Sequence, residues 1–319
     1  MARKKKGDPV HGWVCFDKPY GMTSTSAVGK VRWLYQAQKA GHAGTLDPLA
    51  TGILPIALGE ATKTVPYLVE ADKIYSFTIL FGKTTATYDA EGETIAESDA
   101  RPTRDAILGV LPAYTGTIDQ VPPAFSAIKV DGQRSYDLAR AGVAVELKAR
   151  AVEIFDLTLD ELSDDTATFT LHCGKGTYVR SLARDLCLDL GVCGHVSVLR
   201  READGAFATK DSLSLEKLED LVHRGAHLEA LLGVETALDD IPALPVTQDE
   251  ASRLKQGRDL ALLPRQIESL NAALKARRDD GYLEFPDTVQ ARFQGEVLAL
   301  CELRGGTLHP VRVLQTASQ

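Results

Sequence analysis

One acidic residue stands apart in a stretch of the chain that is rich in glycine. Asp47 lies within residues 41–63 (GHAGTLDPLATGILPIALGEATK), has no other acid within five positions on its N-terminal side, and is followed by Pro48. Glycine permits backbone angles and close approaches that other residues forbid, and proline restricts the chain after the acid. The stretch is therefore predicted to be a shaped loop that presents one carboxylate. The alternative that spacing leaves open is a solvated Asp in a Gly/Pro turn.

A second segment supplies a candidate partner for this acid. Residues 172–180 (HCGKGTYVR) are typical of a strand, a Gly-rich turn and a helix that begins near Thr177, with apolar positions at helical spacing up to Leu190. Arg180 falls in the first turn of that helix, where its side chain can point back toward a cleft. A carboxylate buried alone tends to protonate, so a neighbouring guanidinium would hold Asp47 ionised, and we expect Arg180 to do so. The alternative for Arg180 is a cation on a helix surface.

A lone ionised acid can be a nucleophile, a general base or an electrostatic stabiliser. Familiar motifs of other kinds are incomplete here. A P-loop requires Lys after its last glycine, but Glu60 stands there, and an aspartic-protease motif requires Asp-Thr-Gly, but Pro48 follows Asp47. A zinc site would need a fourth ligand at suitable spacing, which is missing near the three candidates Cys187, Cys193 and His195.

The composition is that of a globular protein large enough for two domains. The chain has 319 residues, 44% hydrophobic and 25% charged, with no apolar run of membrane-spanning length and no signal-peptide core after its basic start, so we expect a cytoplasmic protein. The net charge is −8, yet residues 1–63 hold nine Lys and Arg against four Asp and Glu. Acid concentrates in residues 87–100, 156–165 and 211–220. A chain with its charge segregated in this way can still bind a polyanion.

The strands and helices that must position these residues can be predicted from hydrophobic periodicity, helix caps, and glycine and proline positions. β-Branched, aromatic or alternating segments predict strands at residues 11–16, 73–81, 114–118, 126–130, 152–157, 166–173 and 194–200. Helices are predicted from Ser24 or Thr25, from Thr177, and at residues 61–69, 104–111, 134–141 and within the acidic segment 212–238. Pro242 and Pro245 mark a linker, and residues 246–317 show short strand patterns typical of a small β-rich domain.

Taken together, these segments resemble one family. The stretch 41–63 is similar to the catalytic motif of the TruB family, the bacterial tRNA pseudouridine-55 synthases. The resemblance continues through residues 16–19, 72–75, 122–129, 173–180 and 195–200, and so covers nearly all of residues 11–210 in the family's order. It implies an α+β fold with a mixed, largely antiparallel sheet and flanking helices. We expect a disordered basic tail (1–10), a catalytic domain (11–240) and a PUA-like RNA-binding domain (246–317).

The resemblance also implies a reaction. Members of the family isomerise uridine 55 in the T-loop of tRNA to pseudouridine: the uracil detaches, rotates and reattaches through C5, without a metal or cofactor. Asp47 matches the family's catalytic aspartate, and Arg180 matches the arginine paired with it. Tyr75 matches the tyrosine that stacks on the target base. Two further residues match the lining of the uridine pocket, Tyr178 and Leu199.

His42 matches a histidine that enters the T-loop when the target nucleotide flips out. Flipping is physically required, because the glycosidic bond of a stacked base is inaccessible. Without the resemblance, His42 would be interpreted as a loop side chain with one hydrogen bond, Tyr75 and Leu199 as core residues, and Tyr178 as an aromatic on a helix face. Phosphate contacts are expected from four basic residues, with solvated cations as the alternative: Lys18, Lys63, Lys129 and Arg140.

Three other functions remain open at this point. The first is a non-catalytic RNA-binding protein or tRNA chaperone that uses the same cleft. The second is a pseudouridine synthase that acts on another RNA or within a protein–RNA particle, and the third is a phosphate-binding hydrolase that uses the Gly-rich loop. We expect tRNA as the partner, no membrane, no obligate protein partner and a monomer.

Overall fold

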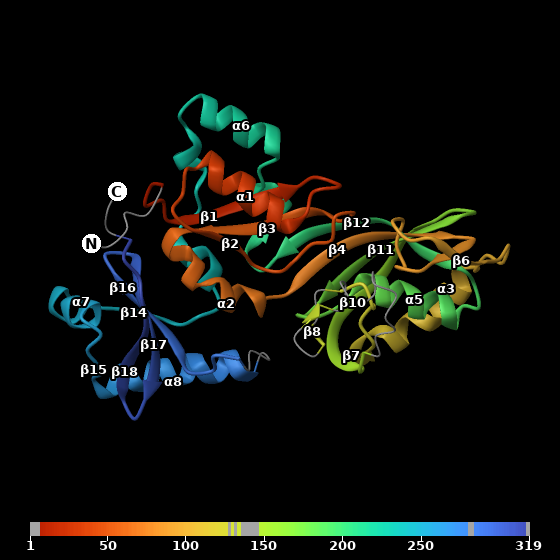
Figure 1. Ribbon diagram of the computed structural model, residues 1–319. Helices are drawn as coiled ribbons and strands as arrows, with labels where there is room; N and C mark the ends of the chain where they lie inside the picture. The colour runs from red at the N-terminus through yellow and green to blue at the C-terminus, as the bar shows by residue number, and fades with distance from the viewer. Residues whose placement is uncertain (1–6, 127–128, 131–132, 135–146, 280–283, 317–319) are drawn as a thin grey trace.

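The computed structural model describes residues 7–126, 129–130, 133–134, 147–279 and 284–316. Within these residues the chain forms one sheet of nine strands and one of five, each with helices packed against it (Figure 1). The larger sheet extends along the molecule, and the smaller sheet lies beside the end of the larger sheet that contains the first strands of the chain (Figure 1). This architecture confirms the predicted α+β class. None of the described helices is both long enough and apolar enough to cross a lipid bilayer.

The nine-stranded sheet has the order β1-β3-β12-β4-β11-β10-β7, with β2 paired to β3 and β13 paired to β12. Strands β12 and β3 run parallel, and the other neighbours in this described sheet run antiparallel. The strands are β1 (Gly12–Lys18), β2 (Ala40–His42), β3 (Thr51–Leu58), β4 (Lys73–Phe81), β7 (Gly116–Gln120), β10 (Arg150–Leu162), β11 (Thr166–Cys173), β12 (Gly194–Asp204) and β13 (Phe207–Ala208).

Alternating side chains explain the middle of this sheet. Along β11 (TATFTLHC) every second residue is buried, as the period of a half-buried strand requires. Phe169 on β11 pairs with Phe77 on β4, and their rings stack with centroids 5.1 Å apart. The bounds of β4 and β11 are those predicted at residues 73–81 and 166–173, so both predictions are confirmed.

Two helices cover the sheet close to the site. Helix α1 (Ser24–Leu34) is capped by Thr23, whose hydroxyl accepts a hydrogen bond from the Ser26 amide, and it buries Ala27, Val31 and Leu34. Helix α5 (Val179–Asp189) contributes Leu182, Ala183 and Leu186 to the same core cluster. The other α-helices among the described residues of this part are α2 (Val65–Val69), α3 (Arg104–Val110) and α6 (Leu215–His223). Strands β5 (Lys83–Thr85) and β6 (Thr94–Glu97) form a short hairpin.

The five-stranded sheet has the order β14-β16-β17-β18-β15 and a core cluster of its own. Its strands are β14 (Ala243–Pro245), β15 (Leu260–Ala261), β16 (Thr288–Phe293), β17 (Glu296–Arg304) and β18 (Thr307–Val313). Helices α7 (Gln248–Lys255) and α8 (Pro264–Asp279) accompany them. The predicted β-rich character of the C-terminal part is confirmed, although its 16-residue helix α8 was not predicted. The division of the chain at residues 240–246 stays a prediction.

The stretch 41–63 contains more regular structure than predicted. Strand β2 ends at His42, and strand β3 spans Thr51–Leu58, so the loop proper is only residues 43–50. Seven of the eight residues of β3 are buried, so no alternation marks it as a strand. A 3-10 helix (Gly59–Lys63) and α2 replace the predicted helix at 61–69, with the break just before Pro66.

Two further predictions were incomplete or wrong. The acidic segment 212–238 contains only the nine-residue α6 and two 3-10 helices, His227–Ala230 and Val234–Leu238. The strand predicted at 126–130 is represented by β8 (Lys129–Val130), which pairs with β9 (Gln133–Arg134). The first residue of the helix predicted at 134–141 is therefore part of a strand, and the rest of that prediction lies outside the described residues.

Candidate active site

Polar contacts from the start of α1 and from the turn before it hold the backbone of the loop that carries Asp47. The Ser24 hydroxyl, at the start of α1, both donates to the Leu46 carbonyl and accepts from the Leu46 amide, each at 2.9 Å. The carbonyl of Pro48 accepts from the Gly21 amide at 2.8 Å and from the Lys18 ammonium at 3.3 Å. These contacts fix the backbone on both sides of Asp47, whose side chain remains 37% exposed.

Arg180 meets Asp47 as predicted. One terminal nitrogen, Nη2, lies 2.8 Å from Asp47 Oδ2 and donates to the Phe125 carbonyl at 2.8 Å. The other, Nη1, lies 3.4 Å from Asp89 Oδ2 and donates to the Thr87 carbonyl at 3.1 Å. The Arg180 side chain is only 4% exposed, so it is a buried cation between two carboxylates rather than a helix-surface charge.

Asp89 is a site residue that the sequence did not indicate. It lies in the acidic segment 87–100 and is 2% exposed. Its carboxylate accepts hydrogen bonds from the Thr87 hydroxyl and, at 3.0 Å, from the Glu91 amide. The turn is held to the sheet by a bridge to Val196 on β12. Only this packing distinguishes Asp89 from the solvated acids around it.

A cavity of about 270 Å³ opens beside the ion pair. Five of the predicted site residues line it together, and Arg201 joins them: Asp47, Tyr75, Tyr178, Arg180, Leu199 and Arg201. They come from the loop, from β4, from the start of α5 and from β12, so four separate parts of the chain converge on one space. Its volume lies near the lower end of the range for small-molecule sites, about 300–1,000 Å³, which suits a single nucleoside.

The two tyrosines of the cavity are neutral phenols at ordinary pH. Burial raises the pKa of Tyr75 to about 12, against the opposing effect of the positive charge of Arg201. Burial also raises the pKa of Tyr178, and the negative charge of Asp47 raises it further. The backbone amide of Tyr178 donates to the Gln120 side chain at 2.8 Å, which holds the first turn of α5 against β7. Both rings are therefore uncharged surfaces within the cavity.

His42 lies at the end of β2, one residue before the loop, and does not belong to the lining of this cavity. Strand pairing places it opposite Ile56 of β3. Burial lowers the pKa of its imidazole; a backbone hydrogen bond at Gly44 opposes that shift, and the charge of Arg201 adds to it. His42 is thus a half-buried, neutral ring at the start of the loop 43–50 that carries Asp47.

The four basic residues predicted to meet phosphates have different surroundings. Lys18 is fully buried; its ammonium donates to the carbonyls of Pro19, Met22 and Pro48, and burial lowers its pKa to about 8. With three hydrogens on three carbonyls, it has none left for RNA. Lys63 pairs with Glu60 at 2.6 Å and donates to the Val313 carbonyl of β18 at 2.8 Å. Two lie outside what the structure describes: the side chain of Lys129 and all of Arg140.

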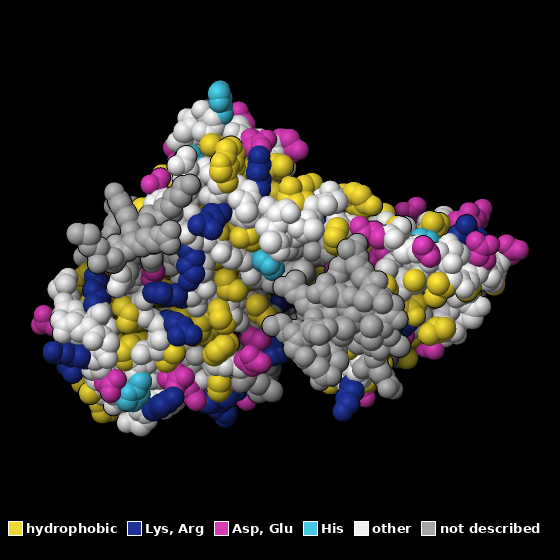
Figure 2. All heavy atoms as spheres, viewed as in Figure 1, with side chains coloured by type: hydrophobic (Ala, Val, Ile, Leu, Met, Phe, Trp, Pro, Cys, Tyr) yellow, Lys and Arg dark blue, Asp and Glu magenta, His cyan; other side chains and the backbone are white. Residues whose placement is uncertain are grey.

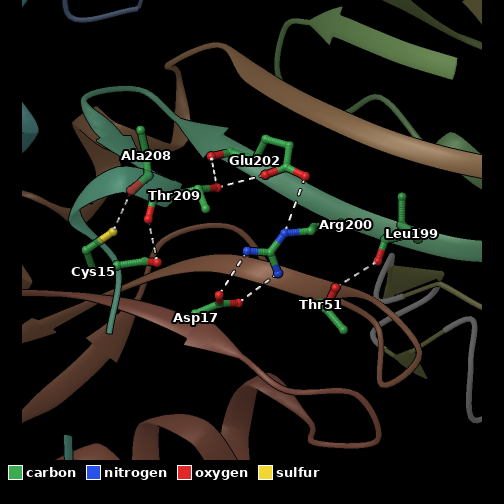
Figure 3. A network of polar contacts seen from close by, with 9 residues as sticks. Cys15, Asp17, Thr51, Leu199, Arg200, Glu202, Ala208 and Thr209 are labelled. Atoms are coloured by element: carbon green, nitrogen blue, oxygen red, sulfur yellow. Dashed lines mark hydrogen bonds and ion pairs between the residues drawn. The ribbon is translucent and has the colours of Figure 1, made fainter. Parts of the chain in front are cut away.

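A polar network supports β12 on the side of β1 (Figure 3). Arg200 donates to both carboxylate oxygens of Asp17, at 3.0 and 2.9 Å, and its Nε lies 3.3 Å from Glu202. The Thr51 hydroxyl donates to the Leu199 carbonyl at 3.5 Å (Figure 3). The Asp17–Arg200 pair crosses β3 and ties β1 to β12, and the Thr51 contact ties β3 to β12, the strand from which Leu199 enters the cavity.

Surface charge is unevenly distributed around the site. On the face shown in Figure 2, Lys and Arg side chains gather where the two sheets adjoin, and Asp and Glu gather at the far end of the large sheet. Lys175, on the cavity rim, contacts Glu70 and lies 2.7 Å from Glu284, which links the rim to the C-terminal part. Among the described residues, no group of three or more His, Cys, Asp or Glu side chains is arranged to hold a metal ion.

The chain is similar to known proteins over nearly its whole length and nearly the whole length of those proteins. The family model for the N-terminal domain of TruB family pseudouridylate synthases matches residues 32–179, and the model for the C-terminal domain of tRNA pseudouridylate synthase B matches residues 180–239. The tRNA pseudouridine synthase B of Caulobacter vibrioides is 58% identical over 99% of both chains. That of Rhodospirillum rubrum is 48% identical over 98% of this chain and 99% of the relative.

Solved structures share the fold at lower identity. The crystal structure of a Cbf5-Nop10-Gar1 complex contains a chain that matches with a TM-score of 0.72 and 23% identity, over 99% of this chain and 91% of that one. At that identity the likeness concerns the fold alone. Full-length identity of 48–58% to its relatives, together with both domain models, shows that the chain belongs to the TruB family of pseudouridylate synthases.

Proposed function

We propose that this protein is a tRNA pseudouridine synthase that isomerises uridine 55 in the T-loop, with Asp47 as its catalytic residue. The observation that carries the proposal is the ion pair of Asp47 with the buried Arg180, at 2.8 Å, on the wall of a nucleoside-sized cavity. The full-length relatives named tRNA pseudouridine synthase B support tRNA as the substrate.

The arrangement provides what an isomerisation at a glycosidic bond requires. The N1–C1′ bond breaks, the uracil turns within the pocket, a C5–C1′ bond forms, and the proton on C5 is transferred, finally to N1; the product is an isomer of the substrate. Arg180 pairs with Asp47 and orients its carboxylate, which can attack the ring or the ribose or assist a glycal route. Tyr75, Tyr178 and Leu199 enclose the base, so that the detached uracil stays in place while it turns.

The position of His42 suits base flipping. The target nucleotide must leave its stack before its glycosidic bond is accessible, which requires a few kcal/mol. His42 ends the strand that leads into the Asp47 loop, and its imidazole is neutral because burial lowers its pKa. A neutral planar ring can fill the space that a flipped base leaves. Recognition of the loop is then by shape and stacking as much as by sequence.

One experiment tests the proposal directly. Purified protein is incubated with an unmodified tRNA transcript, and pseudouridine is mapped by primer extension after carbodiimide treatment. We expect a stop at position 55 and none on a transcript with cytidine there. The matched control is Asp47→Asn, which keeps the size of the side chain and removes its charge; conversion should be lost while tRNA binding remains.

The other outcomes separate the alternative functions. Intact tRNA binding without any stop would refute the enzyme and leave an RNA-binding protein. Stops on another RNA but not on tRNA would refute the proposed substrate. Equal loss of binding and conversion in Asp47→Asn would assign Asp47 a structural role. The cytoplasmic location and the monomeric state stay predictions.

A further inference from the structure

A buried cluster of charges lies directly under the Asp47 loop. Arg201 is 1% exposed, Asp204 is fully buried and Lys73 is 6% exposed. Arg201 Nη2 lies 3.3 Å from one Asp204 oxygen, and Lys73 Nζ lies 3.5 Å from the other. Two cations thus share one carboxylate in the interior, an arrangement that carries a large desolvation penalty.

Arg201 joins three separate parts of the site. Its Nε donates to the Ile53 carbonyl of β3 at 2.7 Å, and Nη2 donates to the Gly44 carbonyl of the loop at 3.3 Å. Arg201 also lies opposite Tyr75 in the pairing of β12 with β4, and its positive charge opposes the rise in the pKa of that phenol. One planar side chain therefore contacts the strand after the loop and the loop itself, and it lies opposite the tyrosine that lines the pocket.

The glycines of the loop region fit closely around this residue. Gly44 has a φ of +65°, and a Cβ there would lie 3.0 Å from Arg201 Nη1 and 3.3 Å from Asp204 Oδ2. Gly52 has a φ of +97°, and a Cβ there would lie only 2.2 Å from the Arg201 carbonyl oxygen. At both positions glycine is favoured for two reasons: the backbone has a positive φ, and Arg201 leaves little room for a Cβ.

Stability alone is a poor explanation for such a cluster. Buried ion pairs are often replaceable by apolar side chains of similar volume without loss of stability. What an apolar side chain cannot do is fix several oxygens at set distances in one plane, which is the particular property of a guanidinium. The oxygens that Arg201 holds are the carbonyls of Gly44 and Ile53, on either side of Asp47, and Tyr75 lies opposite Arg201 in the strand pairing and lines the same cavity.

We propose that Arg201 is a positioning residue: it holds the Gly44 carbonyl of the loop and orients the hydroxyl of Tyr75 on the neighbouring strand, so that Tyr75 and Asp47 face each other across the pocket. The proposal rests on the proposed function, because it concerns the geometry of that reaction. Arg201 lines the cavity floor but acts through these two groups, and Asp204 with Lys73 keeps its guanidinium in place.

The test is a double-mutant cycle between Arg201→Lys and Tyr75→Phe, measured as single-turnover conversion of an unmodified tRNA transcript. Arg201→Lys keeps the charge and removes the planar fork; we expect conversion to slow about 10–100-fold, the effect of one or two charge-assisted hydrogen bonds, with tRNA Kd unchanged. In the Tyr75→Phe background, which lacks the hydroxyl, the same substitution should slow conversion at least threefold less. Arg277→Lys is the matched control, a buried arginine paired with Asp240 at 2.9 Å in the C-terminal part, and should convert at the wild-type rate.

Clear results would overturn the proposal. Equal losses in both backgrounds would show that Arg201 does not act through the Tyr75 hydroxyl, and a wild-type rate for Arg201→Lys would remove the role altogether. If thermal unfolding shows that Arg201→Lys does not fold, Asp204→Asn, which releases the guanidinium while keeping the volume, replaces it in the cycle under the same criteria. Failure of the wild-type protein to convert the transcript would instead refute the proposed function.

Discussion

The ion pair between Arg180 and Asp47 leads to a prediction that can be worked out contact by contact. Substitution Arg180→Lys keeps a positive charge but replaces the two terminal nitrogens of the guanidinium with a single ammonium. In the wild type, Nη2 serves Asp47 and the Phe125 carbonyl, while Nη1 serves Asp89 and the Thr87 carbonyl. A single ammonium can replace one of these two sets, so the other set is left without its donor.

The magnitude follows from the set that is lost. A hydrogen bond to a charged group contributes about 1.5–3 kcal/mol, and one set contains two such contacts. Because Asp47 is 37% exposed, solvent reduces its share, and we take the total at the lower end, about 3 kcal/mol. If that loss falls on the transition state, the rate of conversion drops about 100-fold, since about 1.4 kcal/mol corresponds to a factor of ten.

The assay is single-turnover conversion of an unmodified tRNA transcript with enzyme in excess, alongside tRNA binding and thermal unfolding. Arg184→Lys, one turn later on α5, is the matched control, because Arg184 pairs with Asp185 and does not contact either site carboxylate in the described structure. We expect the control to convert within about threefold of wild type. The reasoning is refuted if Arg180→Lys does the same, or if both variants lose equal activity.

Three other outcomes are expected. His42→Ala should slow conversion about tenfold without abolishing it, because stacking of an aromatic ring on a base contributes about 1–3 kcal/mol; an unchanged rate would exclude a part in flipping. Gly52→Ala should lower the free energy of unfolding in urea by about 2–5 kcal/mol, because its Cβ would overlap the Arg201 carbonyl. Gly116→Ala, at a similar φ of +91° but in open space, should lower it less. The folded state lowers the pKa of His42 below 6.5, so as pH falls through 6.5 the unfolded chain binds the proton first and stability declines; His42→Ala should remove that part of the decline in thermal midpoint.

Local pattern was sufficient to predict part of the fold. Strands β4 and β11 have the predicted bounds, because alternation and β-branched residues mark them in any context. Strand β3 was missed, since it is buried almost throughout and contains Gly52 and Pro55, which disfavour a strand locally. Helix α8 was missed because it is polar around most of its surface and buries only Leu270, Leu274 and Arg277.

The site likewise contains residues that the sequence marks and residues that only the tertiary structure reveals. Asp47 and Arg180 were singled out from their sequence context, and Tyr75, Tyr178 and Leu199 through resemblance to a family; all five line one cavity. The residues that hold them in place were not predicted. Asp89 and Arg201 have no distinctive neighbours in the sequence, and their roles depend on pairing between strands and turns that lie more than a hundred residues apart along the chain.

The order of strands in the large sheet also has a consequence for how the chain acquires its structure. Strands β3 and β4 are neighbours in sequence, but β12, from the latter part of the chain, lies between them. During synthesis, β3 and β4 therefore each lack one hydrogen-bonding neighbour until residues 194–204 have left the ribosome. Pairing strands that are so far apart in sequence also slows folding. Because β12 brings Leu199 and Arg201 into the cavity, a nascent chain that ends before this strand has no complete active site. Maturation of the site is therefore a late event of biosynthesis.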